Sequence, residues 1–316
     1  MLLKNDDKTD NPVSLFSLSK EQTLLLKGIA ILMVILGHMS YITWGGAGGV
    51  TIFLILSGYG IHESFKKNGL KNYWKKKILK VWLPYVIVTI FVLIGKRASN
   101  TKQIIFSLIG LDFGFIADRS MWYISFIMLW YLGYYIASVI SARFGNASNI
   151  ILILSISMFS LIFMFFEKIG VWPEVRGATV YLFAFPLGVA LNCIGNIYVN
   201  KKTQVLIWSM VLLLSSAYLY SVYTNMYGRR MSLAWGLNAL SIVVLINFSG
   251  IINKVLLWLG NHSYQMYLFE LILLDRYGWF DKFNSKFLAD ISIIFTVCVM
   301  SVIYKKTYDS IISVQK

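Results

Sequence analysis

Long apolar runs dominate the chain, and short polar segments separate them. An α-helix of about 20 apolar residues spans a bilayer core of about 30 Å. Lipid cannot satisfy free backbone polar groups, and no run alternates apolar with polar residues as a barrel strand does. The pattern predicts an all-α, polytopic integral membrane protein with about ten transmembrane helices, at 24–44, 47–62, 78–95, 121–140, 149–166, 178–195, 204–222, 233–249, 252–272 and 287–304.

The predicted spans organise the chain as one transmembrane domain, 24–304, between an N-terminal tail, 1–23, and a C-terminal tail, 305–316. The longest gap, 96–120, leaves no room for an attached soluble domain. Within it, 104–117 is short and contains Asp112, so we expect an interfacial or re-entrant segment. The first tail lacks the apolar core and the small-residue cleavage site of a secretory signal.

Composition excludes several classes of protein. Hydrophobic residues make up 58% of the 316 residues and charged residues 14%, and the mean hydropathy is +0.68. A soluble domain is about 45–50% apolar and about 25% charged, so a soluble enzyme, a disordered chain and a fibrous protein are excluded. The two cysteines, Cys193 and Cys298, lie in apolar runs, which predicts small buried hydrophobes and neither a disulfide framework nor a metal site.

The net charge of +15 has a topological explanation. Basic clusters beside transmembrane spans mark cytoplasmic loops, so the charge requires no nucleic-acid partner. The basic loop at 66–80 is therefore predicted to be cytoplasmic. With an even number of spans, this predicts a multi-pass protein of the cell membrane whose termini are both cytoplasmic. One short stretch holds seven of the basic residues: Lys66, Lys67, Lys71, Lys75, Lys76, Lys77 and Lys80.

The first span carries two ionisable residues, Lys27 and His38. Eleven helical steps bring them to one face, about 16 Å apart along the axis. Lys27 lies near the cytoplasmic end, whereas His38 is expected about 9 Å inside the other end at Trp44. An ionisable residue at such depth should face the bundle interior and is a functional candidate. The alternative is a histidine that hydrogen-bonds between helices as packing.

The second span is rich in small residues, from Gly45 to the pair Ser57 and Gly58. Such residues let helix backbones approach closely in a membrane. Taken alone, this segment predicts tight helix packing.

These two spans resemble the opening of the membrane-bound acyltransferase 3 family. The family pattern is a basic residue, ten residues, a histidine and then a span like G-V-x-x-F-F-x-x-S-G-F/Y; here the chain reads KGIAILMVILGH and then GVTIFLILSGYGI. Four later segments also resemble the family, in order: KKILKVWLPY, MWYISFIMLWYLGYY, FAFPLGVAL and LGNHSYQMYLFE. Each match is weak alone, but six in sequence cover most of the chain.

The residues that match the family depart from its pattern in places. Lys27 stands where many members have arginine, and so do Lys76, Lys77 and Lys80 in the basic stretch; a lysine keeps the charge but loses the bidentate fork of arginine. Glu270 stands where the family often has a histidine. A histidine's role cannot be carried over to it, but a carboxylate could orient or charge-balance a partner.

The resemblance implies transfer of an acyl group, often acetyl, from cytosolic acyl-coenzyme A to a hydroxyl of an envelope or capsular glycan or its lipid-linked precursor. His38 would then be the general base or the acyl carrier, with Lys27 and Glu270 as its helpers. The basic residues Lys76, Lys77 and Lys80 would bind the phosphates of the donor; attraction to anionic lipid is their alternative role. Acyl-coenzyme A is a substrate here, and no permanently bound cofactor is implied. The matching residues on the acceptor side are Trp122, Tyr123 and Ser57.

Two other functions are compatible with the sequence. A transporter or flippase for a glycan or lipid explains many helices, but it predicts Gly/Pro-broken helices in two related halves, and the chain has four prolines and no visible repeat. A sensor or scaffold remains open if the lysine replacements mark a lost activity. The remaining histidines are expected to do no chemistry: His62 as a solvated boundary residue beside Glu63, and His262 as packing.

Overall fold

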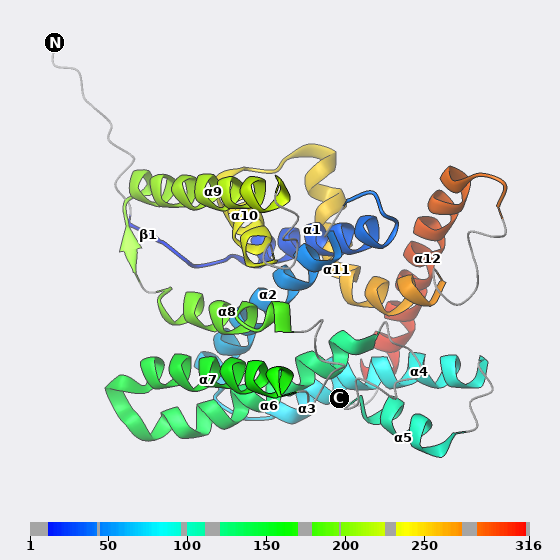
Figure 1. Ribbon diagram of the computed structural model, residues 1–316, viewed down its shortest axis with the longest axis horizontal. Helices are drawn as coiled ribbons and strands as arrows, with labels where there is room; N and C mark the ends of the chain where they lie inside the picture. Colours follow the sequence, from blue (N-terminus) through cyan, green and yellow to red (C-terminus); the bar gives the residue numbers. More distant parts are fainter. Residues whose placement is uncertain are drawn as a thin grey trace, which may run out of the picture.

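The computed structural model describes residues 12–42, 45–95, 100–110, 121–169, 179–195, 197–224, 232–273 and 283–313 (Figure 1). Almost all of this part of the chain is helical, which confirms the all-α prediction. The α-helices are α1 Lys20–His38, α2 Gly45–Asn68, α3 Tyr73–Lys77, α4 Leu83–Gly95, α5 Thr101–Ile109, α6 Trp122–Ser141, α7 Ser148–Lys168, α8 Ala184–Cys193, α9 Lys201–Thr224, α10 Ser232–Leu245, α11 Gly250–Leu271 and α12 Lys286–Ser313.

Shorter elements join some of these helices. A π-helical turn, Ile78–Trp82, makes α3 and α4 one continuous helix, and a 3₁₀ segment, Ala142–Ala147, connects α6 to α7, which lie side by side (Figure 1). Thr179–Tyr181 is a further 3₁₀ turn. Two short strands that the hydropathy pattern does not predict, β1 Val13–Ser14 and β2 Tyr198–Val199, pair antiparallel.

Helix length and hydropathy identify five membrane-spanning candidates in the described part of the chain: Lys20–His38, Tyr73–Gly95, Trp122–Phe166, Lys201–Val222 and Lys286–Ile311. The range Trp122–Phe166 includes both α6 and α7. These helices support a multi-pass membrane protein, but the predicted count of about ten is not confirmed. The reason is clearest at α8 and α10, which have only 10 and 14 residues where 178–195 and 233–249 were predicted to span.

The ambiguous segment 104–117 is described only in part. Its first residues belong to α5, a helix of nine residues that is capped by the Asn100 side chain and ends at Gly110. Nine residues give roughly 14 Å of helix, less than half a bilayer core. This part therefore does not span, while 111–117 lies outside the described residues.

Helix α1 begins at a capping box. The Ser19 hydroxyl accepts a hydrogen bond from the Gln22 backbone at 3.0 Å, and the Gln22 side chain accepts one from the Ser19 backbone at 2.9 Å. These two bonds satisfy backbone donors that the helix itself cannot pair. The start of α1 is thereby fixed four residues before the predicted span begins.

Helices α1 and α11 cross with their backbones in contact. A Cβ on Gly28 would lie 2.2 Å from the carbonyl oxygen of Leu256, and one on Gly260 would lie 2.0 Å from that of Leu24. Only glycine permits this approach. The crossing of α2 and α8 is built in the same way, because a Cβ on Gly58 would lie 2.1 Å from the Phe185 carbonyl oxygen. The tight packing predicted for the second span is confirmed.

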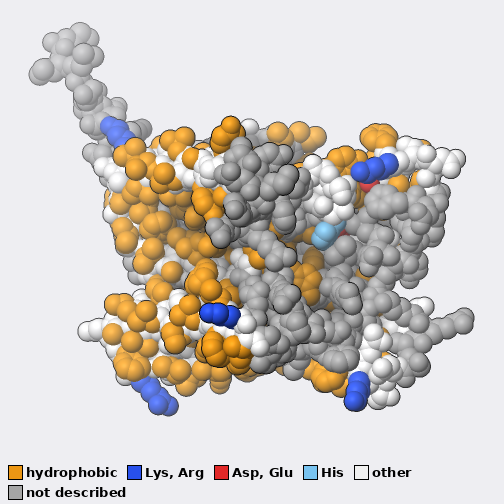
Figure 2. Space-filling model, in the orientation of Figure 1, with side chains coloured by type: hydrophobic (Ala, Val, Ile, Leu, Met, Phe, Trp, Pro, Cys, Tyr) orange, Lys and Arg blue, Asp and Glu red, His pale blue; other side chains and the backbone are white. Residues whose placement is uncertain are grey.

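The described surface is mostly apolar. Figure 2 shows hydrophobic side chains over most of the described part of this face, with the lysines and arginines in view set apart from one another. Large apolar residues such as Phe91, Ile94, Leu213 and Phe295 are exposed. An exposed apolar surface of this extent fits a lipid environment rather than water.

Candidate active site

The side chain of His38 pairs with that of Glu270. His38 is the last residue of α1 and Glu270 lies near the end of α11, and the imidazole Nδ1 is 2.7 Å from Oε1 of Glu270. Both residues lie ten positions past the α1–α11 crossing, from Gly28 to His38 and from Gly260 to Glu270. The crossing therefore brings together two side chains that are 232 residues apart in sequence.

The two partners differ in their exposure to the surroundings. The Glu270 side chain is fully buried, and the His38 side chain is 33% exposed. An ionised carboxylate accepts hydrogen bonds and does not donate them, so beside ionised Glu270 a neutral imidazole carries its proton on Nδ1 and has Nε2 as the acceptor. A buried acid that orients a partly accessible imidazole in this way is the arrangement that makes a histidine a general base.

The second nitrogen of His38 faces a glycine. Nε2 has no hydrogen-bond partner among the described residues, and a Cβ on Gly46 would lie 3.7 Å from it. The missing side chain at Gly46 leaves Nε2 approachable. The prediction that the first helix continues past His38 is wrong, because α1 ends at His38. Trp44, from which the depth of His38 was counted, lies outside the described residues, so that depth stays a prediction. The turn at Ser40, where φ is +64°, ends the helix early.

Lys27 lies three turns from His38 in a different setting. It lines a small cavity of about 140 Å³ between α1, α2, α6 and α11. The Ser57 hydroxyl interacts with the hydroxyls of Tyr123 and Tyr131 in the wall of this cavity. The structure thus brings Lys27 together with two of the predicted acceptor-side residues, Ser57 and Tyr123, and not with His38. The other lining residues are Phe53, Val81, Ile124, Ile127, Ser263, Tyr264 and Tyr267.

One face of α11 connects the cavity to the histidine. Ser263 and Tyr267 line the cavity, and Glu270 follows them on the same face at the next helical step. The Tyr123 ring packs against Tyr267 with ring centroids 5.6 Å apart. The cavity and the His38–Glu270 pair therefore belong to one region of the bundle.

The predicted donor-side lysines lie on and beside the π-helical turn. A π-helical turn is a rare departure from the α-helix that is frequent at functional sites. Three tyrosines of α11 and α12 donate hydrogen bonds to its carbonyls and to that of Pro84: Tyr264 to Val81 at 2.6 Å, Tyr304 to Pro84 at 2.9 Å, and Tyr308 to Leu79. These bonds hold the segment that carries Lys76, Lys77 and Lys80 against the rest of the bundle.

The lysine side chains around this turn lack acidic partners. No carboxylate lies within salt-bridge distance of Lys76, Lys77 or Lys80 among the residues that the structure describes. The Lys77 ammonium lies 4.2 Å from the centroid of the Tyr131 ring, a cation–π contact. Lys27 experiences the positive charges of Lys305 and Lys80. A group of lysine side chains without carboxylate partners creates a positive potential that attracts an anionic ligand.

Other lysines of the basic stretch are neutralised. Lys66 and Lys67 each pair with Glu63 at 3.0 Å, beyond the apolar part of α2. The Asn192 amide also donates to Glu63 at 3.1 Å. These contacts, the Asn192 hydrogen bond foremost, lower the pKa of Glu63 to about 2, so the carboxylate stays charged at neutral pH. The basic stretch thus divides into paired and unpaired lysines.

The prediction for His62 is wrong. Its side chain is buried, with 2% exposure of the residue, and not solvated. Nδ1 lies 2.8 Å from the Tyr134 hydroxyl, and Nε2 lies 3.3 Å from Sγ of Cys193. Cys193 and Cys298 are half-buried rather than fully buried.

His262 makes the local contact that its packing role predicts. It contacts Trp258 of its own helix, with Nδ1 2.9 Å from the carbonyl oxygen.

The two aromatic side chains at the start of α6 pack against other aromatic rings of the protein. Trp122 stacks on Tyr181 with centroids 5.6 Å apart, and Tyr123 is buried against Tyr267. A sugar-stacking role for these residues stays a prediction. Tyr123 reaches the Lys27 cavity, and Trp122 does not line it.

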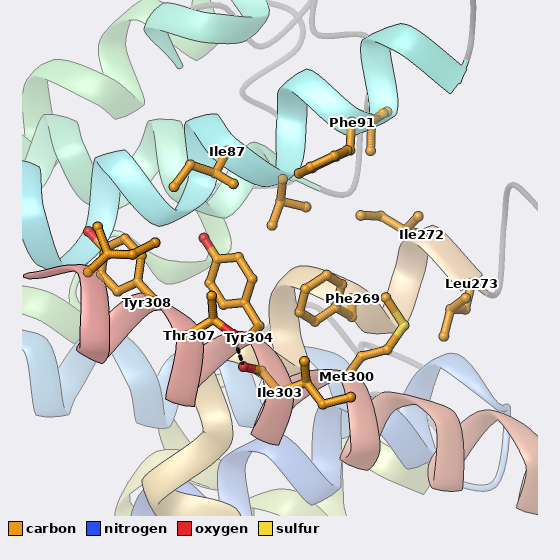
Figure 3. Close-up of a pocket in the computed structure, with 13 residues that line it drawn as sticks. Ile87, Phe91, Phe269, Ile272, Leu273, Met300, Ile303, Tyr304, Thr307 and Tyr308 are labelled. Carbon is orange, nitrogen blue, oxygen red and sulfur yellow. Dashed lines mark hydrogen bonds between the residues drawn. The ribbon is translucent and has the colours of Figure 1, made fainter.

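A larger groove of about 610 Å³ lies between α4, α11 and α12 (Figure 3). Its wall is almost entirely apolar, with Ile87, Phe91, Phe269 and Met300 among the side chains that point into it. The few polar groups are already bonded: the Thr307 hydroxyl donates to the Ile303 carbonyl, the dashed line in Figure 3, at 2.9 Å. The described lining of the groove contains no acid and no base, so it offers no group for acid–base chemistry.

Comparison with known proteins places the chain in a family. The model of the acyltransferase domain of the acyltransferase 3 family matches residues 25–304. The chain therefore belongs to this acyltransferase family, which confirms the resemblance inferred from its motifs. Searches of curated proteins and of solved structures give no match.

Proposed function

We propose that the protein transfers an acyl group, acetyl in the first instance, from cytosolic acyl-coenzyme A to a hydroxyl of an envelope or capsular glycan or its lipid-linked precursor. The observation that carries the proposal is the His38–Glu270 pair, in which a buried carboxylate orients an imidazole whose Nε2 is free among the described residues. Membership of the acyltransferase family supports the reaction class.

The proposed chemistry uses Nε2 as a base. Nε2 takes the proton of the acceptor hydroxyl, and the oxygen attacks the thioester carbonyl of the donor. The carbon–sulfur bond breaks, and coenzyme A leaves as a thiol after its sulfur takes the proton from Nε2. The positive charge that forms on the imidazole is balanced by Glu270. In the other route, Nε2 attacks the thioester carbonyl, the carbon–sulfur bond breaks, and coenzyme A leaves as a thiolate. The acyl group then passes from Nε2 to the acceptor oxygen, and the proton of the acceptor hydroxyl goes to the thiolate.

The donor is proposed to enter from the side of the unpaired lysines. Lys76, Lys77 and Lys80 would meet the phosphates of coenzyme A, and Lys27 would meet the arm of the donor in the cavity that it shares with Ser57 and Tyr123. With this side and both termini in the cytoplasm, His38 lies towards the opposite face of the membrane. The separation of about 16 Å between Lys27 and His38 is then the distance that the flexible arm of the donor bridges.

The test is acyl transfer in membranes that contain the protein. Radiolabelled acetyl-coenzyme A is supplied, and base-labile label is measured in the glycan and lipid-linked sugar fractions. We expect label with the wild-type chain and none with His38→Gln at an equal protein level. Movement of a glycan or lipid without consumption of acetyl-coenzyme A would instead support the transporter function.

A further inference from the structure

A second pair of side chains lies close to His38 and has no part in the chemistry above. After α1 the chain folds back, and the Tyr41 backbone amide donates to the Leu36 carbonyl at 2.9 Å. The Tyr41 hydroxyl donates a hydrogen bond to Oδ2 of Asp290, near the start of α12. This contact joins two positions that are 249 residues apart and ties α12 to the end of α1.

Asp290 is buried but only half satisfied. The residue is 4% exposed, and its Oδ1 has no hydrogen-bond partner among the residues that the structure describes. A buried carboxylate oxygen without a partner is costly and rare, so its retention calls for a ligand or another explanation. Because Oδ2 is bonded to Tyr41, the free Oδ1 lies beside the Tyr41 hydroxyl, next to the turn that follows His38.

The groups around Asp290 suit an uncharged ligand rich in hydroxyl groups. Tyr41 is 55% exposed, so much of its ring is open to contact. The Lys286 ammonium lies 5.0 Å from the centroid of that ring. An anionic ligand such as acyl-coenzyme A would be repelled by the Asp290 carboxylate. A metal ion is disfavoured, because the described residues contain no group of three or more His, Cys, Asp or Glu side chains placed to hold one.

We propose that Tyr41, Asp290 and Lys286 form the acceptor subsite and that its ligand is a pyranose sugar. Oδ1 of Asp290 accepts a hydrogen bond from a sugar hydroxyl, and the exposed ring of Tyr41 packs on the apolar face of the sugar. A neighbouring hydroxyl of the same sugar then reaches Nε2 of His38. This inference rests on the proposed function, because it assigns the acceptor of that reaction to the His38 end of the bundle and the donor to the lysine end.

The test measures sugar binding apart from catalysis. The full chain is placed in lipid nanodiscs, and binding of the methyl glycosides of glucose, galactose, rhamnose and N-acetylglucosamine is followed by saturation-transfer NMR. We expect at least one glycoside to bind the wild type and Asp290→Asn to weaken that binding about ten- to a hundredfold. Tyr41→Phe, which keeps the ring but removes its hydroxyl, should weaken it less. Asp309→Asn, the same change at an exposed position of α12, is the matched control and should bind as the wild type does.

The outcomes separate the subsite from the proposed function. Absence of glycoside binding to the wild type, or equal binding by Asp290→Asn, overturns the subsite. Release of coenzyme A in the absence of sugar is measured in parallel. If Asp290→Asn lowers this release as much as it lowers binding, Asp290 acts through His38 and the subsite is overturned. A wild type that binds a glycoside through Asp290 but transfers no acyl group leaves the subsite standing and refutes the proposed function.

Discussion

His38 and His62 lie on neighbouring helices, and each has a polar partner on Nδ1. His62 is buried, and both of its nitrogens contact neutral groups, the Tyr134 hydroxyl and the Cys193 thiol. His38 is one-third exposed, contacts the buried carboxylate of Glu270, and keeps Nε2 free among the described residues. A histidine with both nitrogens engaged serves packing, whereas one with a charged partner and a free nitrogen can move a proton. Burial alone therefore does not distinguish a candidate base from a packing histidine.

The strongest test of this comparison exchanges each histidine for glutamine. His38→Gln keeps a hydrogen-bonding side chain but removes the base, so acyl transfer should fall by about 10²–10⁴-fold. His62→Gln should leave transfer within a few-fold of wild type. Transfer is measured in membranes at matched protein levels. Near-normal transfer by His38→Gln would mean that this histidine is packing as well.

Substitution of the Nδ1 partners of the two histidines should also have different effects on acyl transfer. Glu270→Gln removes the negative charge that orients and balances His38, and we expect transfer to fall about ten- to a hundredfold. Tyr134→Phe, which removes the partner of His62, should leave the rate unchanged. Steady-state rates at saturating donor separate the two variants. Equal losses in both would remove the distinction between a charged and a neutral partner.

The lysines allow a similar comparison at the other end of the bundle. Lys80→Ala removes an unpaired cation, so the apparent KM for acyl-coenzyme A should rise about tenfold. Lys66→Ala removes a lysine that already pairs with Glu63 and should leave KM unchanged. Both are measured by coenzyme A release over a range of donor concentrations. A Lys80→Ala variant with wild-type KM would leave the basic stretch only its topological role.

The smallest effect on activity belongs to His62, whose loss should be seen in stability. His62→Gln leaves the Tyr134 hydroxyl or the Cys193 thiol without its partner, which should lower the free energy of unfolding by about 1–3 kcal/mol. Thermal unfolding in detergent measures the loss, and activity at low temperature is the control. A large loss of activity without a loss of stability would assign chemistry to His62.

Hydropathy predicted the long helices well, since α6 and α7 begin and end within two residues of the predicted spans. It failed at α8, a helix of only ten residues whose apolar run begins several residues before the helix does. Apolar runs report an apolar environment, and the end of a helix depends on local hydrogen bonds. At Ser40 and Tyr41 a turn ends α1 before the apolar run does.

The site could be predicted only where a motif named its residues. His38 and Lys27 stood out because ionisable groups are costly in apolar helices, and Glu270 because it stands where the family often has a histidine. The pairing of His38 with Glu270 depends on a helix crossing that no local pattern encodes, and so does the contact of Tyr41 with Asp290. His62 was misjudged because Glu63 and Lys66 beside it are typical of a solvated helix end, while the residues that bury it come from α6 and α8.

Helices α1 and α11 are in closest contact at Gly28 and Gly260, so a change in their crossing angle moves the rest of each helix about this point. His38 and Glu270 are carried at the ends of two arms of ten residues, each roughly 15 Å long. At that length, a change of about 4° in the angle between the arms moves their tips apart by about 1 Å, enough to break a hydrogen bond of 2.7 Å. The contact between His38 and Glu270 is thus sensitive to any force that changes the angle between α1 and α11, including the thickness and lateral tension of the surrounding bilayer.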